Sequence, residues 1–192
     1  MTTTDVISLL DVCRMGSRAL GPGLRYVVWT QGCPFSCQGC ISPEGHSVGG
    51  GHVVSINSLA DDIVANKTIG GLTISGGEPF LQSEAVLKLL RLLRARRPDL
   101  NVIIFTGFTI DRLTWPDARQ ILSLTDVLID GPYVDALNDG KGLRGSSNQQ
   151  IHCLTPRLAN HLDEMLNGPR SVEMHVGDTQ IKNIGIPIKH SL

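Results

Sequence analysis

The sequence of 192 residues lacks several features that would place it in a familiar class of protein. No apolar run approaches the roughly 18 residues that a membrane-spanning helix needs. The formal net charge is only −1, so no general affinity for nucleic acid is expected. Internal repeats, low-complexity tracts and long linkers are also missing. What remains is a chain suited to a single domain over residues 1–192, long enough to bury a core without disulfide bonds.

The amino-terminal residues 1–5 carry neither the charged nor the apolar region of a secretory signal peptide. Clustered cysteines that are not paired also suit a reducing compartment. We therefore expect a cytoplasmic protein without a membrane partner.

Three of the five cysteines, Cys33, Cys37 and Cys40, fall within eight residues at a Cys-x3-Cys-x2-Cys spacing. Glycines and a proline in the same stretch favour a loop wrapped around a ligand over a helix. Three closely spaced thiolates suit either an iron–sulfur cluster or a cysteine-rich zinc site. The other two cysteines, Cys13 and Cys153, stand alone in the sequence.

The number of thiols helps to separate these two kinds of metal site. A structural zinc site usually has four protein ligands, often from paired Cys-x2-Cys units, and the sequence has no second unit. A cluster held by three thiolates instead leaves one iron without a protein ligand, and a substrate or cofactor can bind there. The pattern therefore favours a catalytic iron–sulfur site, with a zinc module as the alternative.

Apolar stretches that alternate between strand-like and helix-like patterns predict an α/β fold with a largely parallel sheet. Strands are expected at residues 6–12 (with a short helix as the alternative), 24–30, 72–75, 101–106, 127–130 and 149–154. Helices are expected at residues 58–66 with Asn57 or Ser58 as the cap, 82–97, 109–124 with a break before Pro116, and 155–166. Residues 171–188 look like two further strands joined near Gly177-Asp178. In such folds the functional site lies at the carboxyl ends of the strands.

Small and polar residues follow the predicted strands at that edge of the sheet. Gly76 and Gly77 have no Cβ, so a ligand can approach their backbone, although an ordinary strand-to-helix turn has the same pattern. Thr106 and Asp130 end the next two strands, where caps and turns also use such residues. His46, close to the cysteine loop, is expected to be a surface residue rather than a further ligand.

Taken together, the cysteine spacing and the downstream stretch Ser-Gly-Gly-Glu-Pro at residues 75–79 resemble the radical S-adenosylmethionine (SAM) superfamily. Within it, the sequence is similar to the activating proteins of anaerobic ribonucleotide reductase and, more loosely, to those of pyruvate formate-lyase. The similarity runs from about residue 20 to residue 152 and includes residues 21–23, 38–39, 126–132 and 144–149. It implies a shortened partial (β/α) barrel with its core at about residues 20–155 and a carboxyl-terminal extension, 156–192, that carries a β-hairpin.

The resemblance also implies the cofactors. Cys33, Cys37 and Cys40 would each bind one iron of a 4Fe–4S cluster, and the fourth iron would bind the amino and carboxylate groups of SAM. An electron from the cluster would then cleave SAM and form a 5′-deoxyadenosyl radical, so that no side chain is implied as catalytic. Glu78 would either face the SAM ammonium group or bond locally to orient its loop. The positions implied as SAM-binding are Gly39, Ile41, Ser75, Gly76, Gly77, Glu78, Thr106 and Asp130.

The function implied by the resemblance is the formation of a glycyl radical on a partner such as anaerobic ribonucleotide reductase, with electrons from a donor such as flavodoxin or ferredoxin. Binding a glycine loop needs an open sheet edge, and residues 144–149 either line that opening or bridge two strands. A radical SAM enzyme acting on a small molecule or peptide is one alternative, and a non-catalytic zinc or Fe–S module is another. The extension after residue 156 leaves the identity of the partner open.

Overall fold

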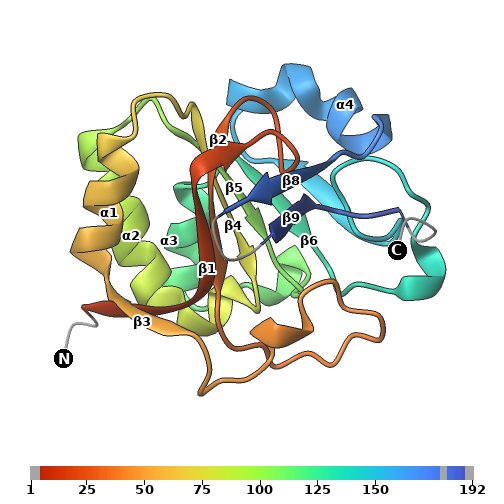
Figure 1. Ribbon diagram of the computed structural model, residues 1–192, viewed down its shortest axis with the longest axis horizontal. Helices are drawn as coiled ribbons and strands as arrows, with labels where there is room; N and C mark the ends of the chain where they lie inside the picture. The colour runs from red at the N-terminus through yellow and green to blue at the C-terminus, as the bar shows by residue number, and fades with distance from the viewer. Residues whose placement is uncertain (1–4, 178–180, 189–192) are drawn as a thin grey trace.

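A seven-stranded sheet in the order β3-β1-β2-β4-β5-β6-β7 forms the centre of the computed structural model, which describes residues 5–177 and 181–188 (Figure 1). The four central strands are parallel: β2 (Arg25–Thr30), β4 (Gly71–Gly76), β5 (Asn101–Phe105) and β6 (Val127–Asp130). The three outer strands pair antiparallel: β1 (Val6–Ser17), β3 (His52–Ser55) and β7 (Gln150–Cys153). The predicted α/β class is confirmed, and the sheet is parallel in its centre and antiparallel at both sides.

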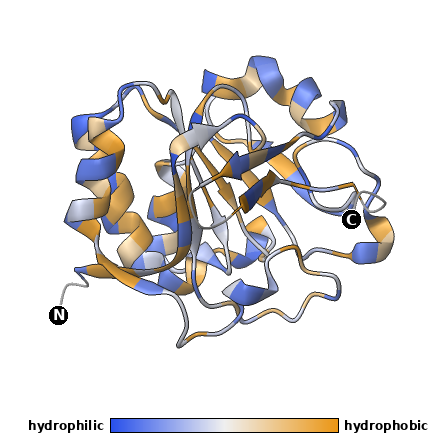
Figure 2. Cartoon of the chain, viewed as in Figure 1, coloured by the Kyte–Doolittle hydropathy of each residue, from blue (hydrophilic) through white to orange (hydrophobic). Residues whose placement is uncertain are grey.

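Three helices cover one face of this sheet: α1 (Ile56–Ala65), α2 (Ser83–Arg96) and α3 (Pro116–Ser123) (Figure 1). Each presents an apolar stripe to the strands. In α2, for example, Val86, Leu90 and Leu93 recur at helical spacing and are buried. Figure 2 shows the helices carrying both hydrophobic and hydrophilic residues, whereas the central strands are mostly hydrophobic. None of the helices among the described residues is long and apolar enough to cross a membrane.

One helix start differs from the sequence expectation and one predicted break is confirmed. Helix α1 starts earlier than expected, because Ser55 and not Asn57 or Ser58 is its cap, and the Ser55 side chain accepts a hydrogen bond from the Ser58 amide at 3.5 Å. The break expected before Pro116 in the helical segment 109–124 is confirmed: a short 3-10 turn, η3 (Ile110–Arg112), precedes α3. The second element begins at Pro116, whose missing N–H costs nothing at the first helical position.

Short 3-10 turns connect several other elements. They are η1 (Pro43–Gly45), η2 (Pro79–Gln82), η4 (Asp135–Leu137) and η5 (Pro156–His161). The last of these leads into α4 (Leu162–Asn167), so the helix expected at 155–166 is half 3-10 and half α. Its predicted start is confirmed, because the Thr155 side chain accepts from the Arg157 amide.

Strand β3 was not predicted from the sequence. It pairs with β1 at the edge of the sheet, from Val6 opposite Ser55 to Leu9 opposite His52. Most of its side chains are exposed, so its four residues show no alternation that could reveal a strand. Strand β1 is confirmed but extends to Ser17, well beyond the predicted 6–12.

The carboxyl-terminal extension folds back over the face of the sheet that the helices leave open. Strands β8 (Val172–Val176) and β9 (Ile181–Gly185) form the expected antiparallel hairpin, and residue Asp178 of its expected turn lies outside the described residues. Ile184 of β9 and the following Ile186 pack on Val27 and its neighbours. Met165 of α4 packs on the same face further along the sheet. Strands from the middle of the chain are thereby covered on both sides.

Buried charges occupy the amino-terminal edge of the parallel strands. The Arg25 guanidinium is fully buried and donates to the Thr73 hydroxyl (2.7 Å), the Leu72 carbonyl (2.7 Å), the Pro22 carbonyl (3.0 Å) and the Asn101 side-chain oxygen (2.5 Å). No carboxylate of the described residues forms an ion pair with it, and burial lowers the pKa of Arg25 to about 9.

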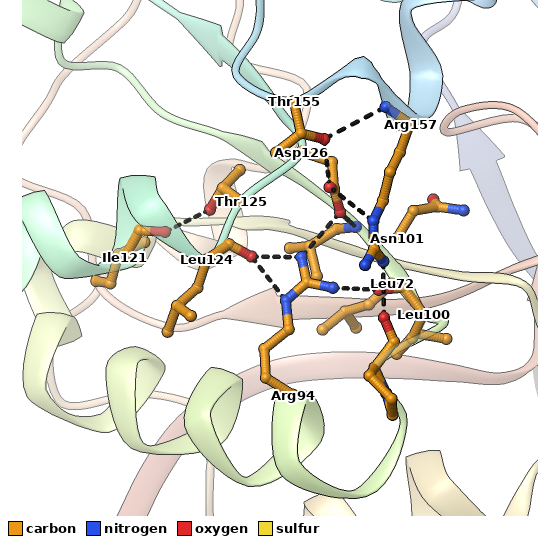
Figure 3. Close-up of polar contacts among 12 residues, drawn as sticks. Leu72, Arg94, Leu100, Asn101, Ile121, Leu124, Thr125, Asp126, Thr155 and Arg157 are labelled. Atoms are coloured by element: carbon orange, nitrogen blue, oxygen red, sulfur yellow. Dashed lines mark hydrogen bonds and ion pairs between the residues drawn. The ribbon is translucent and has the colours of Figure 1, made fainter.

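Asp126, at the start of β6, is the acidic counterpart at this edge. It accepts hydrogen bonds from the Val102 amide (2.8 Å), the Arg94 guanidinium (2.9 Å) and the Thr155 hydroxyl (2.6 Å). Burial by itself would raise the pKa of Asp126, but these donors, Thr155 foremost, bring it below its usual value. Figure 3 shows Arg94 pointing toward both Asp126 and the Leu124 carbonyl. This edge is therefore a closed polar network.

Candidate functional site

A cavity of about 620 Å³ opens at the opposite edge, where the parallel strands end. Its volume falls in the range of about 300–1,000 Å³ that small-molecule and cofactor sites occupy. Each of the four parallel strands contributes the residues that follow it: Cys33 after β2, Gly77 after β4, Thr106 after β5 and Gly131 after β6. The site thus lies at the predicted edge of the sheet, because the carboxyl ends of parallel strands meet there.

All three clustered cysteines border this cavity as free, half-buried thiols. Burial raises the pKa of Cys33 and of Cys40, so a metal must displace their protons when it binds. Three free thiols on one loop can each bind a separate iron, so the donor set fits a 4Fe–4S cluster with one iron left open toward the cavity.

The base of the cysteine loop is pinned by backbone hydrogen bonds to the segment that follows it. The Gly32 amide donates to the Gly45 carbonyl at 2.8 Å, and the Cys33 amide donates to the His46 carbonyl at 3.2 Å. Side chains of the loop are thereby held in place although the loop has no regular secondary structure. His46 is half-buried and borders the cavity, and its expected role as a surface residue rather than a further ligand stays a prediction.

Gly39, between the last two cysteines, is required by the local packing. Its φ of +71° is in the left-handed region. A Cβ at this position would also lie 3.1–3.3 Å from the side chain of Asp135 in η4. Gly39 itself is not among the residues that border the cavity, but its neighbours Cys40 and Ile41 are.

Two glycines after β4 bring the second loop against the first. A Cβ on Gly76 would lie 2.4 Å from the backbone of Thr30, and one on Gly77 would lie 2.3 Å from the carbonyl oxygen of Gly32. Hydrogen bonds cross the same contact, from the Gly77 amide to the Thr30 carbonyl and from the Glu78 amide to the Gly32 carbonyl, both at 2.8 Å. The glycines therefore permit close approach of two protein backbones, in addition to bordering the cavity with Ser75.

Glu78 bonds locally, the second of the two roles that the sequence left open. One carboxylate oxygen accepts from the Phe80 amide (2.9 Å) and the Thr106 hydroxyl (2.8 Å), and the other accepts from the Gly107 amide (2.8 Å). Burial raises the pKa of Glu78 to about 7, an effect that these donors partly oppose. The carboxylate thus joins the loops after β4 and β5 while it also borders the cavity.

Asp130 lies at the carboxyl-terminal edge of the sheet, as predicted, but is not among the residues that border the cavity. Side chains alternate along a strand, and Ile129 faces the extension whereas Leu128 and Asp130 face the helices. The buried Asp130 carboxylate accepts from the Ile110 amide at 2.6 Å, and its other oxygen lies 3.2 Å from the His152 ring.

Several cavity residues were not foreseen from the sequence. Trp29 and Phe105 reach it because they lie on the strand faces opposite the helices, a pattern that strand alternation could have revealed. Within residues 144–149, Gly145 and Gln149 border the cavity, and the Gln149 side chain also bonds to the Gly145 amide and the Gly131 carbonyl. The stretch therefore both lines the opening and bridges two loops. Residues 182–186 of the extension complete the wall, and no sequence motif marks them.

Three thiols and a glycine-rich loop at the carboxyl ends of parallel strands define an iron–sulfur protein of the α/β class. Residues 19–152 match the model of a protein family described as a 4Fe-4S single cluster domain. The chain belongs to this family and, by its relatives, to the radical SAM activating enzymes. The predicted cofactors, a 4Fe–4S cluster and SAM, are thereby confirmed.

Three relatives match about two thirds of this chain or more. The chain is 34% identical over 144 residues to the anaerobic ribonucleoside-triphosphate reductase-activating protein of Vibrio cholerae, a match that covers 70% of this chain and 91% of the relative. The protein of the same name from Escherichia coli K12 is 33% identical over 144 residues. The pyruvate formate-lyase-activating enzyme of Listeria monocytogenes is 30% identical over 132 residues, 66% of this chain and 53% of that enzyme.

Proposed function

We propose that this protein generates a glycyl radical on a partner enzyme such as an anaerobic ribonucleotide reductase. The observation that carries the proposal is the gathering of three free thiols and the Ser75–Glu78 loop around one cavity, in a chain related to reductase-activating proteins. When bound, the 4Fe–4S cluster and SAM supply a 5′-deoxyadenosyl radical that can abstract hydrogen from a glycine.

The chain's own residues hold and orient these groups. Cys33, Cys37 and Cys40 bind the cluster on a loop whose base is fixed by backbone hydrogen bonds. Glu78 ties the loop after β4 to Thr106, so that two walls of the site keep their relative positions. The SAM side of the cavity consists of Ile41, Ser75, Gly76, Gly77, Glu78 and Thr106.

Gly39 and Asp130 act behind this wall. Gly39 lets the cysteine loop pack on Asp135, and Asp130 holds the Ile110 amide at the end of β6. Both are positioning residues, because neither borders the cavity.

Apolar rings restrict water on one side of the cavity. Phe35, on the cysteine loop, packs edge-on against Phe108 with ring centroids 4.9 Å apart, and Phe108 packs in turn on Trp115. Phe35 itself borders the cavity, whereas Phe108 and Trp115 support it from the core on the helix side. Trp29 and Phe105 add apolar surface from the opposite face of the sheet. A reactive radical needs such a wall, because exclusion of solvent prevents side reactions.

The proposal also extends to the fold, the domain organisation, the cellular location and the electron donor. The four parallel strands are inferred to be a shortened partial (β/α) barrel, which is supported by helices on one face only and by a site at the strand ends. The chain is taken as one domain with a core at about 20–155 and an extension at 156–192. We place it in the cytoplasm, with a low-potential electron donor such as flavodoxin or ferredoxin.

Anaerobic reconstitution with iron and sulfide tests the proposal. Reduction in the presence of SAM should yield methionine and 5′-deoxyadenosine, and addition of a candidate anaerobic reductase should yield a glycyl-radical doublet in its EPR spectrum. Omission of SAM is the control. A fully loaded cluster that cleaves no SAM would contradict the proposal. A modified small molecule without a protein radical would instead indicate a radical SAM enzyme that acts on small molecules. Stoichiometric zinc without iron would indicate a non-catalytic module.

A further inference from the structure

Strand β9 of the carboxyl-terminal hairpin borders the cavity over four of its five residues. Lys182, Asn183, Ile184 and Gly185 all line it, as does the following Ile186. Neighbouring side chains of a strand point to opposite faces, so a cavity that met only one face would touch every second residue. Contact with five consecutive residues means that the edge of β9, with its backbone N–H and C=O groups, faces the cavity.

This edge has no strand beside it in the ranges that the structure describes. β9 pairs with β8 alone, and no residue of β8 borders the cavity, so β8 lies on the far side. In Figure 1, β9 is drawn between β8 and the orange loop that carries the cysteines. Among the described residues, no backbone hydrogen bond from elsewhere reaches residues 181–186. An unpaired strand edge is a template for a further strand.

The hairpin is held firmly enough to present a preformed edge. The Lys182 ammonium pairs with the Asp11 carboxylate of β1 at 2.6 Å. Glu173 of β8 accepts from the Arg18 amide at 2.8 Å, and Ile184 is buried in the core beneath the hairpin. A strand fixed in this way loses little conformational entropy when another segment pairs with it.

We propose that the cavity-facing edge of β9 binds the glycine-containing segment of the radical acceptor as an added β-strand. This inference rests on the proposed function and names how that function's substrate is recognised, by its main chain and in an extended conformation. Pairing of this kind aligns a segment through backbone hydrogen bonds and is tolerant of its side chains. Hairpin residues 172–185 lie outside the 19–152 region that matches the family, so this recognition element is an addition to the shared site.

The outer face of the same hairpin indicates that the acceptor is a protein with a body beyond this segment. Val172, Met174, Val176 and Ile181 form this face, and their exposed fractions are 48%, 66%, 71% and 63%. Such a stripe of large apolar side chains next to a cavity is typical of a surface that another protein covers. One partner can therefore occupy both the edge and the outer face.

The experiment uses the cluster-free full chain and a fluorescein-labelled dodecapeptide centred on the acceptor glycine of a candidate anaerobic reductase. Binding is measured by fluorescence anisotropy with the parent peptide and with a series N-methylated at one amide each. Only alternate amides of an added strand point toward β9. N-methylation should therefore weaken binding at least about fivefold at every second position and little between, the loss expected for a hydrogen bond. If the loss of affinity does not recur at every second N-methylated position, the inference is overturned.

Proline variants locate the pairing on the protein. Adjacent N–H groups of β9 point to opposite sides, so Lys182→Pro and Asn183→Pro together remove one amide that faces β8 and one that faces the cavity. Lys182→Ala and Asn183→Ala are the matched controls. The variant that keeps the thermal stability of its alanine control should nonetheless lose at least about fivefold in peptide affinity. Parent-like affinity in both proline variants would contradict pairing with β9.

The apolar face is tested separately with the complete reductase. Met174→Asp should weaken binding of the whole protein about tenfold or more but leave dodecapeptide binding unchanged, because the peptide reaches only the edge. Met15→Asp is the matched control, since Met15 is 72% exposed on β1. Equal loss in both variants would contradict the assignment of this face.

These readouts separate the inference from the proposed function. Period-two peptide binding without a glycyl radical on the reductase would sustain recognition by β9 and contradict the activation. If a glycyl radical forms but N-methylation weakens peptide binding without a two-residue period, the activation would stand and recognition by β9 would be contradicted.

Discussion

The two edges of the parallel sheet have opposite characters. At the amino-terminal edge, Arg25 and Asp126 are buried and bonded to partners on several strands. Figure 3 shows the contacts of Asp126 in this closed network. At the carboxyl-terminal edge, free thiols and glycine-rich loops surround a cavity. Parallel α/β proteins place stability at the first edge and chemistry at the second. Substitutions at the two edges should therefore fail in different ways.

The largest expected effect is at the cavity edge. Cys37→Ala should abolish cluster assembly and, with it, SAM cleavage, because an iron loses its thiolate. The free energy of unfolding of the cluster-free protein should hardly change, since the thiol is half-buried in a loop. Iron content, 5′-deoxyadenosine yield and urea unfolding measure the three quantities.

Cys153→Ala serves as the control for that substitution, because Cys153 is a free cysteine of β7 that does not border the cavity. It should assemble the cluster normally. Loss of iron in Cys153→Ala together with retention of iron in Cys37→Ala would contradict the assignment of Cys37 as a cluster ligand.

At the amino-terminal edge, a substitution should lower stability and leave SAM cleavage almost unchanged. Arg25→Met is expected to lower the free energy of unfolding by about 3 kcal/mol or more, because buried carbonyls of Leu72 and Pro22 lose their donor. SAM cleavage per loaded cluster should stay within about twofold of the parent. Arg14→Met is the control, since the ion pair of Arg14 with Asp62 is exposed and worth about 1 kcal/mol at most. Similar destabilisation in both variants would show that the buried network has no special role.

A smaller effect on stability is expected where the loop after β4 touches the cysteine loop. There, one substitution should change both the unfolding free energy and cluster loading. Gly77→Ala places a Cβ about where the Gly32 carbonyl lies, so the cysteine loop must shift and cluster loading should fall severalfold. The unfolding free energy should drop by about 1–3 kcal/mol. Gly70→Ala is the matched control, because nothing lies within 4 Å of its Cβ position and its φ is not positive. Full cluster loading in Gly77→Ala would contradict the close-packing role.

The smallest effect concerns pH. The pKa of Glu78 is raised by burial to about 7, so the folded state binds its proton more tightly than the unfolded state does. This contribution to stability is complete below the ordinary carboxyl pKa of about 4.3 and is lost as pH rises through about 7. Unfolding of the cluster-free protein should therefore become easier as pH rises across that window. Glu78→Gln should flatten this part of the curve, and an unchanged slope would contradict the assignment to Glu78.

Much of the fold was predictable because its signals are local. The apolar β-branched run that ends at Asp130 was placed correctly as β6, and Thr155-Pro156 was placed correctly as a helix start. The four-residue edge strand β3 was missed, since exposed side chains carry no alternation. The direction of Asp130 was also not predictable, because the face on which a strand residue lies depends on the register with its neighbours.

The sequence by itself determined the ligand chemistry of this protein. Three thiols spaced within one loop and a Gly-Gly-Glu stretch after a buried strand depend on residues close together in the chain, and their chemistry does not change with the rest of the fold. Only the tertiary structure decided that Gly77 meets the Gly32 backbone, that Glu78 joins two loops, and that the edge of β9 walls the cavity. Those contacts join segments that are far apart in sequence, and whether they form is set by strand order, register and packing.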